Sequence, residues 1–239
     1  MKKIISAVFA LFALVSFCFA GDVATFVEEG WSDDGKIYVF GQYGKTDKSF
    51  QGWAELIEVD IAKNDYVNNG YFSIKPSSVT AGKSGYDVFE SLMAKSFYST
   101  KPLNLKPTAP DQVLYICEAP EKKGSDTIIF KDFLGSEIDN PDSFTVRIIP
   151  EVNGSGMNAK SSFYISIEKR NAEGSLIASQ IVGNPGIQRK GVTGYKIEKI
   201  ICDKSGKNMI FVVEKTMEDK TGINIRYMVE ACVLNADFN

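Results

Sequence analysis

The sequence contains no histidine, and this absence narrows the chemistry open to the chain. Ser-His-Asp and Cys-His nucleophile activation both need an imidazole, as do many metal sites. The 27 Lys and Arg residues stand against 30 Asp and Glu residues and nowhere form a block, so electrostatic capture of nucleic acid is not expected. The sequence therefore excludes histidine-dependent hydrolases, and it predicts no nucleic-acid partner, no metal and no cofactor.

Cysteine is scarce as well. Apart from Cys18, the chain carries only Cys117, Cys202 and Cys232. These three lack the paired CxxC spacing of a zinc or redox site. An odd number permits one disulfide or none, and we interpret the three as small buried hydrophobic residues. Cys202 and Cys232 fall on the outer strands of a predicted three-stranded unit, too far apart for a direct bridge.

The first twenty residues have the pattern of a signal peptide. Met1–Lys3 is a short basic segment, Ile4–Phe19 is apolar, and Ala20 offers the small residue that signal peptidase prefers. We expect residues 1–20 to be removed before Gly21, leaving residues 21–239 as a single β-rich domain, periplasmic or secreted, without stable membrane insertion. The alternatives are an uncleaved membrane anchor and a lipoprotein acylated at Cys18.

The exported part has ordinary globular composition and begins with strand signals. Apolar residues make up 44% of the chain, which suffices for a core. We predict strands over Val23–Glu28, Ile37–Phe40 and Trp53–Ile61, with a tight turn at Ser32–Lys36 between the first two. Because Glu58 falls opposite the apolar positions of its strand, one face of that strand is expected to be solvated.

A similar unit returns near the C-terminus. It comprises strands over Tyr195–Cys202, Met209–Val213 and Ile223–Leu234, with a turn at Asp203–Lys207. Setting Gly35 on Gly206 also sets Phe40 on Phe211, and one extra loop residue then sets Glu58 on Glu230. The sequence therefore predicts two related antiparallel units, one near each end of the exported chain.

The region between the two units predicts one substantial helix and several short strands. Ser84–Tyr98 has apolar residues at helical spacing, with Ser84 as a candidate N-cap. Five strand candidates follow, with a hairpin turn at Asn171–Gly174 before the last: Gln112–Glu118, Thr127–Phe130, Phe144–Glu151, Ser162–Lys169 and Leu176–Val182. The predicted fold class is mainly β, a β-rich α+β protein built from antiparallel sheets.

The two units carry a resemblance to known families. A strand, a Ser-Asp-Asp-Gly-Lys turn, a strand, a loop and a strand resemble one blade of the periplasmic β-propellers related to the Tol system, although Ser32–Lys36 lacks their proline. The chain also resembles an uncharacterised family of predicted secreted bacterial proteins, through Gly21–Val27, Phe40–Gly44 and the Met209–Val229 hairpin. That resemblance implies export and a shared fold, and it brings no activity with it.

The best binding candidate in the sequence is the loop Gly41–Trp53. Its aromatic residues Tyr43, Phe50 and Trp53 stand among glycines, so they could stack on a sugar or a peptide. The alternative is that the three side chains fold back as a hydrophobic lid on the sheet. The expected partner is an envelope protein or a glycan.

Two classes of function remain open. The first is an exported, non-enzymatic binding or interaction protein, which needs no catalytic residues, and we assign none. The alternative is a carboxylate-dependent glycan hydrolase, which needs two acids a few ångströms apart. The acids available in the first unit are Glu28, Glu29, Glu55, Glu58 and Asp60.

Overall fold

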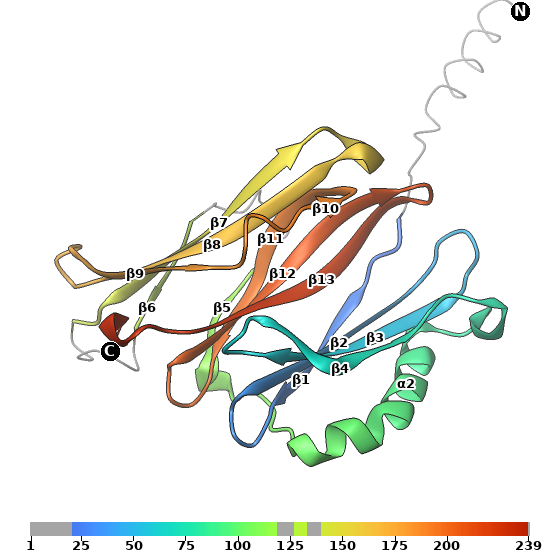
Figure 1. The fold of residues 1–239 in the computed structure, drawn as a ribbon, viewed down its shortest axis with the longest axis horizontal. Helices are drawn as coiled ribbons and strands as arrows, with labels where there is room; N and C mark the ends of the chain where they lie inside the picture. Colours follow the sequence, from blue (N-terminus) through green and yellow to red (C-terminus); the bar gives the residue numbers. More distant parts are fainter. Residues whose placement is uncertain (1–20, 119–126, 133–139, 239) are drawn as a thin grey trace, which may run out of the picture.

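The computed structural model describes residues 21–118, 127–132 and 140–238, so the predicted signal peptide lies outside the described residues. Three antiparallel sheets and helix α2 are stacked as four layers (Figure 1). From the helix upward in that view, the layers are α2, an N-terminal sheet, a central sheet and an outer sheet. Three hydrophobic clusters fill the three spaces between successive layers.

The N-terminal sheet has the order β1-β2-β3-β4. Its strands are β1 (Thr25–Trp31), β2 (Ile37–Lys45), β3 (Gly52–Asp60) and β4 (Asp65–Ile74). The predicted solvated face of the third strand is wrong, because helix α2 covers that face and packs on Ala54 and Leu56. Glu58 is consequently buried.

Helix α2 (Gly85–Thr100) forms where the apolar spacing predicts it. The Ser84 hydroxyl accepts a hydrogen bond from the Asp87 backbone N–H at 3.0 Å, and the Asp87 carboxylate accepts one from the Ser84 N–H. This capping box satisfies backbone donors that the first turn leaves free. Val88, Phe89 and Leu92 are the residues that face the sheet.

The central sheet has the order β13-β12-β11-β5. Its strands are β5 (Val113–Ile116), β11 (Val192–Cys202), β12 (Asn208–Asp219) and β13 (Gly222–Val233). Both of its faces are covered, since β12 sends Ile210 and Val212 toward the N-terminal sheet and Phe211 and Val213 toward the outer sheet.

The outer sheet contains the remaining strands. These are β6 (Ile128–Lys131), β7 (Ser143–Asn153), β8 (Lys160–Arg170), β9 (Leu176–Val182) and β10 (Arg189–Lys190), with both β9 and β10 pairing with β8. Five single-turn 3₁₀ helices complete the described fold: Ser78–Thr80, Lys101–Leu103, Pro110–Gln112, Gly156–Asn158 and Ala236–Phe238. No described helix is both long and apolar enough to cross a membrane.

The first turns of the two predicted units are built alike. Gly35 and Gly206 have φ of 69° and 70°. The Ser32 N–H donates to the Ile37 carbonyl at 2.8 Å, and the Asp203 N–H donates to the Asn208 carbonyl at 3.0 Å. Both hairpins therefore close through the same backbone conformation.

The predicted register of the second hairpin is wrong by one residue. Phe40 pairs with Ile57 in the N-terminal sheet, whereas Phe211 pairs with Glu230 in the central sheet. Glu230 is therefore the counterpart of Ile57, and Glu58 has no carboxylate counterpart. The cause is the connection between the strands, which is a polar loop after β2 and only a tight turn after β12.

The fold class is confirmed: the protein is mainly β, with antiparallel sheets and one substantial helix. None of the three sheets closes on itself within the described residues, and the likeness to propeller blades stays a prediction. Cys117, Cys202 and Cys232 are free. Met209 of β12 pairs with Cys202 on one side and Cys232 on the other, as the predicted strand order requires.

Candidate functional site

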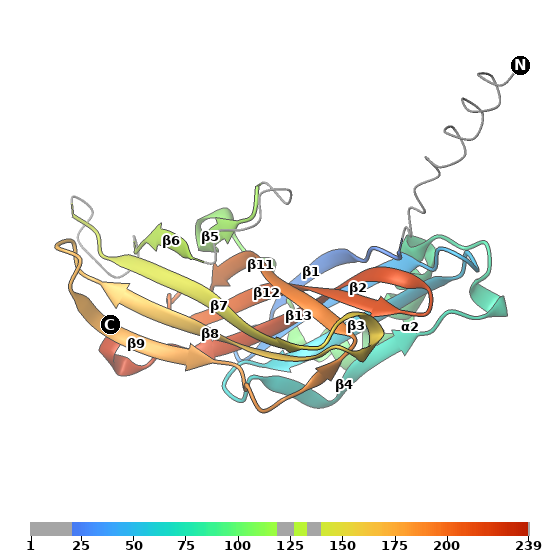
Figure 2. The ribbon, with the colours of Figure 1, turned by 90° about the horizontal axis from the view of Figure 1, so that it is seen from above.

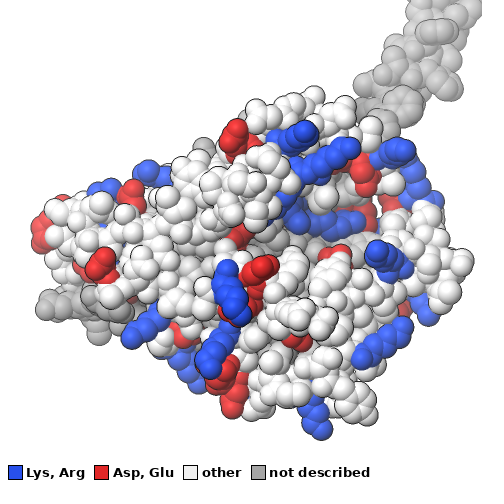
Figure 3. All heavy atoms as spheres, in the orientation of Figure 1, with Lys and Arg blue, Asp and Glu red and all other residues white. Residues whose placement is uncertain are grey.

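One edge of each sheet lies on the same face of the molecule. These edges are β4, β13 and the segment from β9 to β10, which lie together on the near side in Figure 1 and along the lower side in Figure 2. Between them is a cavity of about 710 Å³, lined by the β3–β4 turn, the β9–β10 connection, Lys215 and the C-terminal half of β13, Met228–Val233. We call this cavity the edge groove. In Figure 3, Lys and Arg side chains border a hollow on this face.

Side-chain amides occupy much of the outer edge of β13. Gln42 bonds the backbone of Tyr227, Asn64 bonds that of Ala231, and Gln180 bonds that of Val233 and Asn235. The Tyr227 N–H donates to the Gln42 carbonyl oxygen at 2.8 Å. Edge strands present backbone groups that invite another strand, and occupying these groups discourages that addition. The amides leave a polar floor to the edge groove.

Asn64 holds its position through the conformation of the β3–β4 turn. Its φ is 51°, in the left-handed region that asparagine tolerates. Its amide oxygen accepts from the Ala231 N–H at 2.6 Å, while its amide nitrogen donates to the Glu230 carboxylate at 2.5 Å. One side chain of the N-terminal sheet thus fixes both the backbone and an acid of the central sheet.

Glu230 joins the three sheets at the edge groove. Its carboxylate belongs to β13, accepts a hydrogen bond from Asn64 of the N-terminal sheet and lies 3.7 Å from the guanidinium of Arg189 in β10. Only 6% of Glu230 is exposed. Burial raises the pKa of this carboxyl, and the Asn64 hydrogen bond and the Arg189 charge partly offset that rise.

Four cations stand at or beside the groove, and one of them, Lys63 of the β3–β4 turn, is ion-paired with Asp60 at 2.7 Å. The Arg189 guanidinium lies 4.9 Å from the centre of the Phe163 ring and forms an ion pair with Glu230. Arg226 forms an ion pair with Asp22. Lys215 of β12 lines the groove and is half-buried, and none of the described residues forms a hydrogen bond or ion pair with its ammonium group. Burial, assisted by the charge of Arg189, lowers the pKa of Lys215 to about 8.

Two tyrosines of β4 stand at the border of the groove with parallel rings. The ring centroids of Tyr66 and Tyr71 are 6.3 Å apart with 6° between the ring planes, and the residues are 47% and 46% exposed. The Tyr71 hydroxyl donates to Glu55 at 2.6 Å. Burial raises the pKa of the Tyr66 hydroxyl, with further increases from Glu55 and Glu230 and a decrease from Arg189.

A bulge in β4 brings these two rings to one side. Residues five apart fall on opposite faces of a regular strand. Here Tyr66 pairs with Val59 and Tyr71 with Ile57, two positions on the same face of β3. The extra residues between them include Asn69, at φ 61°. Both tyrosines therefore stand on the side of the N-terminal sheet that faces the central sheet.

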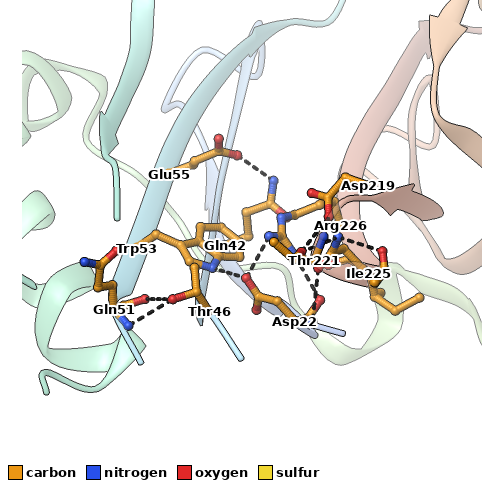
Figure 4. A network of polar contacts seen from close by, with 12 residues as sticks. Asp22, Gln42, Thr46, Gln51, Trp53, Glu55, Asp219, Thr221, Ile225 and Arg226 are labelled. Carbon is orange, nitrogen blue, oxygen red and sulfur yellow. Dashed lines mark hydrogen bonds and ion pairs between the residues drawn. The ribbon is translucent and has the colours of Figure 1, made fainter. Parts of the chain in front are cut away.

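A polar network beside the groove holds Asp22, close to the N-terminal end of the described residues, in place (Figure 4). The Asp22 carboxylate accepts from the Trp53 indole N–H at 2.5 Å and from Arg226 at 2.8 Å. The Arg226 guanidinium lies 4.1 Å from the centre of the Trp53 ring. In the same network, Gln42 donates to Glu55 at 2.7 Å. These contacts join the N-terminal sheet to the central sheet.

The predicted aromatic binding residues occupy three different environments. Trp53 faces the central sheet and is 5% exposed. Tyr43 is half-buried against helix α2, with its ring centroid 5.6 Å from that of Phe89. Phe50 is 61% exposed at the tip of the β2–β3 hairpin. The structure does not bring the three rings together, and a binding role for them stays a prediction.

The acids offered for glycan hydrolysis engage separate partners. Glu28 bonds Lys199 at 2.6 Å, and Asp60 bonds Lys63 at 2.7 Å. Glu55 and Glu58 stand on opposite faces of β3. Burial raises the pKa of Glu58 and, with the charge of Glu90, that of Glu29. None of the described contacts joins two of these five acids.

The residues that line the edge groove were not predicted from the sequence. No strand was expected over 65–74, because Asn68–Gly70 has the composition of a turn. A usable signal was the pair of tyrosines flanking that segment. Lys215 and Arg189 carried no local signal, since their proximity depends on three sheets meeting.

The described residues contain no group of three or more His, Cys, Asp or Glu arranged to hold a metal ion. A family model with the description "Predicted secreted protein (DUF2259)" matches residues 39–232. No curated protein matches the chain.

Proposed function

The chain belongs to this family of predicted secreted proteins, and from that premise we propose that it is an exported, non-enzymatic binding protein that takes a glycan into the edge groove. The observation that carries the proposal is the exposed, parallel pair Tyr66 and Tyr71 beside an amide-lined cavity. Flat aromatic faces accept the apolar faces of sugar rings, and amides bond sugar hydroxyls.

The dimensions of the groove suit a short oligosaccharide. Its volume of about 710 Å³ lies within the range of roughly 300–1,000 Å³ that is typical of small-molecule sites. Asn64, Gln180, Asn184 and Asn235 line it with side-chain amides. Such a surface offers both donors and acceptors, as a ligand rich in hydroxyl groups requires.

A peptide strand fits the same groove less well. Strand addition needs unpaired backbone groups along a sheet edge. Gln42, Asn64 and Gln180 already bond backbone groups along β13, and the segment Asp22–Ala24 bonds both polar groups of Ile225. A glycan, which brings its own hydroxyl donors and acceptors, does not need these groups to be free.

The proposal is tested by binding of residues 21–239 to an array of soluble glycans. We expect retention of a subset of glycans and loss of at least about tenfold in affinity in Tyr66→Ala, a loss equivalent to about 1.4 kcal/mol. Tyr98→Ala is the matched control, because Tyr98 is exposed on helix α2, away from the groove.

Three outcomes of the array would contradict the proposal. If the wild-type protein retained no glycan, glycans would be excluded as its ligands. An equal loss of affinity in Tyr98→Ala, or a loss of affinity only in Phe50→Ala, would show that the glycan binds to a surface other than the edge groove. Release of shortened products from a retained glycan would replace the non-enzymatic function with the hydrolase alternative.

A further inference from the structure

We infer that the glycan is acidic, and that the edge groove holds its carboxylate or phosphate group between Lys215 and Arg189. This inference rests on the proposed function and specifies the ligand class of the same groove. It follows from the ammonium group of Lys215, which lines the groove and to which none of the described residues forms a hydrogen bond or ion pair.

The two arginines near Lys215 already have carboxylate partners. Arg226 is bound by Asp22 at 2.8 Å, and Arg189 lies 3.7 Å from Glu230. Lys215 differs from the two arginines, because none of the described residues forms a hydrogen bond or ion pair with its ammonium group. It lines the groove, so an anion that enters the groove reaches it.

Two acids of this region, Glu55 and Glu230, accept hydrogen bonds from other residues. Glu55 lies within electrostatic range of Lys215 but accepts hydrogen bonds from Gln42 at 2.7 Å and Tyr71 at 2.6 Å. Glu230 is bonded by Asn64 and shared with Arg189. A partly buried ammonium without a directly bonded counter-ion is unfavourable, and a ligand anion in the groove is a partner that relieves this cost.

The positions of Lys215 and Arg189 also match the expected place of the sugar. Tyr66 lies within electrostatic range of Arg189, whose charge offsets part of the rise that burial causes in the pKa of the Tyr66 hydroxyl, and both residues line the groove. A sugar ring on the tyrosine faces would therefore carry its acidic substituent toward the two cations. Arg189 supplies directional N–H donors, and Lys215 supplies an ammonium group that none of the described residues hydrogen-bonds or ion-pairs.

The test compares acidic and neutral monosaccharides by NMR titration of residues 21–239. The probes are glucuronate and galacturonate against glucose and galactose, and glucose 6-phosphate against inorganic phosphate. We expect the acidic sugars to bind about tenfold more tightly than the neutral ones, the effect of one charge-assisted hydrogen bond. Neutral sugars provide the reference in every variant.

Substitutions then test whether Lys215 causes the preference for acidic over neutral sugars. In Lys215→Met, which keeps a similar volume without the charge, the ratio of acidic to neutral affinity should fall to about one, whereas Lys215→Arg should retain it. Lys95→Met makes the same charge change on the exposed surface of helix α2 and should leave the ratio unchanged. Thermal melting verifies that each variant is folded.

The outcomes separate this inference from the proposed function. Equal binding of acidic and neutral sugars by the wild type, or an acid preference that survives in Lys215→Met, would overturn the acidic ligand while leaving glycan binding in place. Inorganic phosphate binding as tightly as glucose 6-phosphate would overturn the sugar as the source of the anion. Failure of every sugar to bind would overturn the proposed function itself.

Discussion

Trp53 shows how one aromatic residue can have two interpretations in a sequence and a single environment in the fold. Next to glycines it is typical of a binding loop, but it belongs to β3, whose inner face packs on the central sheet. Its indole N–H is bonded by Asp22, and Arg226 covers its ring. These contacts place Trp53 in the interface between two layers.

Replacing Trp53 by alanine should therefore be strongly destabilising. Trp53→Ala removes a buried aromatic side chain, the N–H group that donates to Asp22 and the ring that Arg226 covers. We expect the free energy of unfolding to fall by about 3–5 kcal/mol. Phe50→Ala, at the exposed hairpin tip, should change it by less than about 0.5 kcal/mol. Urea denaturation measures both. Wild-type stability in Trp53→Ala would show that the ring is not part of the packed interface.

The residues of the groove were the least predictable part of the molecule. Lys215 sits in a strand of mixed polar and apolar residues, where a solvated face is the natural interpretation. It lines a cavity whose other residues include some from β3, β10 and β13, strands of three different sheets. Such convergence is a tertiary property, and no periodicity within one strand encodes it.

Turns and caps, in contrast, were predictable because their signals are local. The Gly35 turn, the Gly206 turn and the Ser84 cap all depend on residues within a few positions. The register of the β12–β13 hairpin was not predictable, since it depends on where the turn between two strands of 12 residues each falls. Strand β4 was missed for a related reason, because its bulge contains the composition of a turn.

The two equivalent turns give a prediction at the level of secondary structure. Gly35→Val and Gly206→Val should each destabilise the protein by about 1–3 kcal/mol, because a β-branched residue is strained at positive φ. No heavy atom beyond its chain neighbours lies within 4 Å of a Cβ built on Gly35, so the cost there is conformational rather than steric.

The matched control for these turns is Gly194→Val. Gly194 lies in β11, and the nearest atom to an added Cβ is in Thr216 at 3.7 Å, an ordinary contact. Thermal denaturation of the three variants compares them. Equal melting temperatures for all three would contradict the shared turn conformation.

At the scale of the whole molecule, the stack of layers explains which sheet is most protected. The central sheet packs on both neighbours, so Cys202 and Cys232 both lie in the cluster it shares with the outer sheet. Burial raises the pKa of each thiol to about 12. A buried thiol with a raised pKa is a poor nucleophile.

Thiol labelling should therefore report global unfolding. At pH 8, Cys202 and Cys232 remain protonated in the folded state and should not react with a disulfide reagent, whereas half-buried Cys117 should react first. In urea all three should react. Mass spectrometry of the labelled sites measures this order, and rapid labelling of Cys202 or Cys232 in the native protein would contradict the packing of the outer sheet on the central sheet.

The most direct test of the account is to locate the ligand. NMR spectra of the methyl groups of residues 21–239, titrated with glucuronate, report which surfaces the sugar contacts. We expect the shifts to concentrate on Ile61, Ile181, Ile187 and Val229, which line the edge groove, and to disappear in Tyr66→Ala. Shifts confined to Val79 or Ile129, which are exposed away from the groove, or unchanged spectra at saturating sugar, would contradict it.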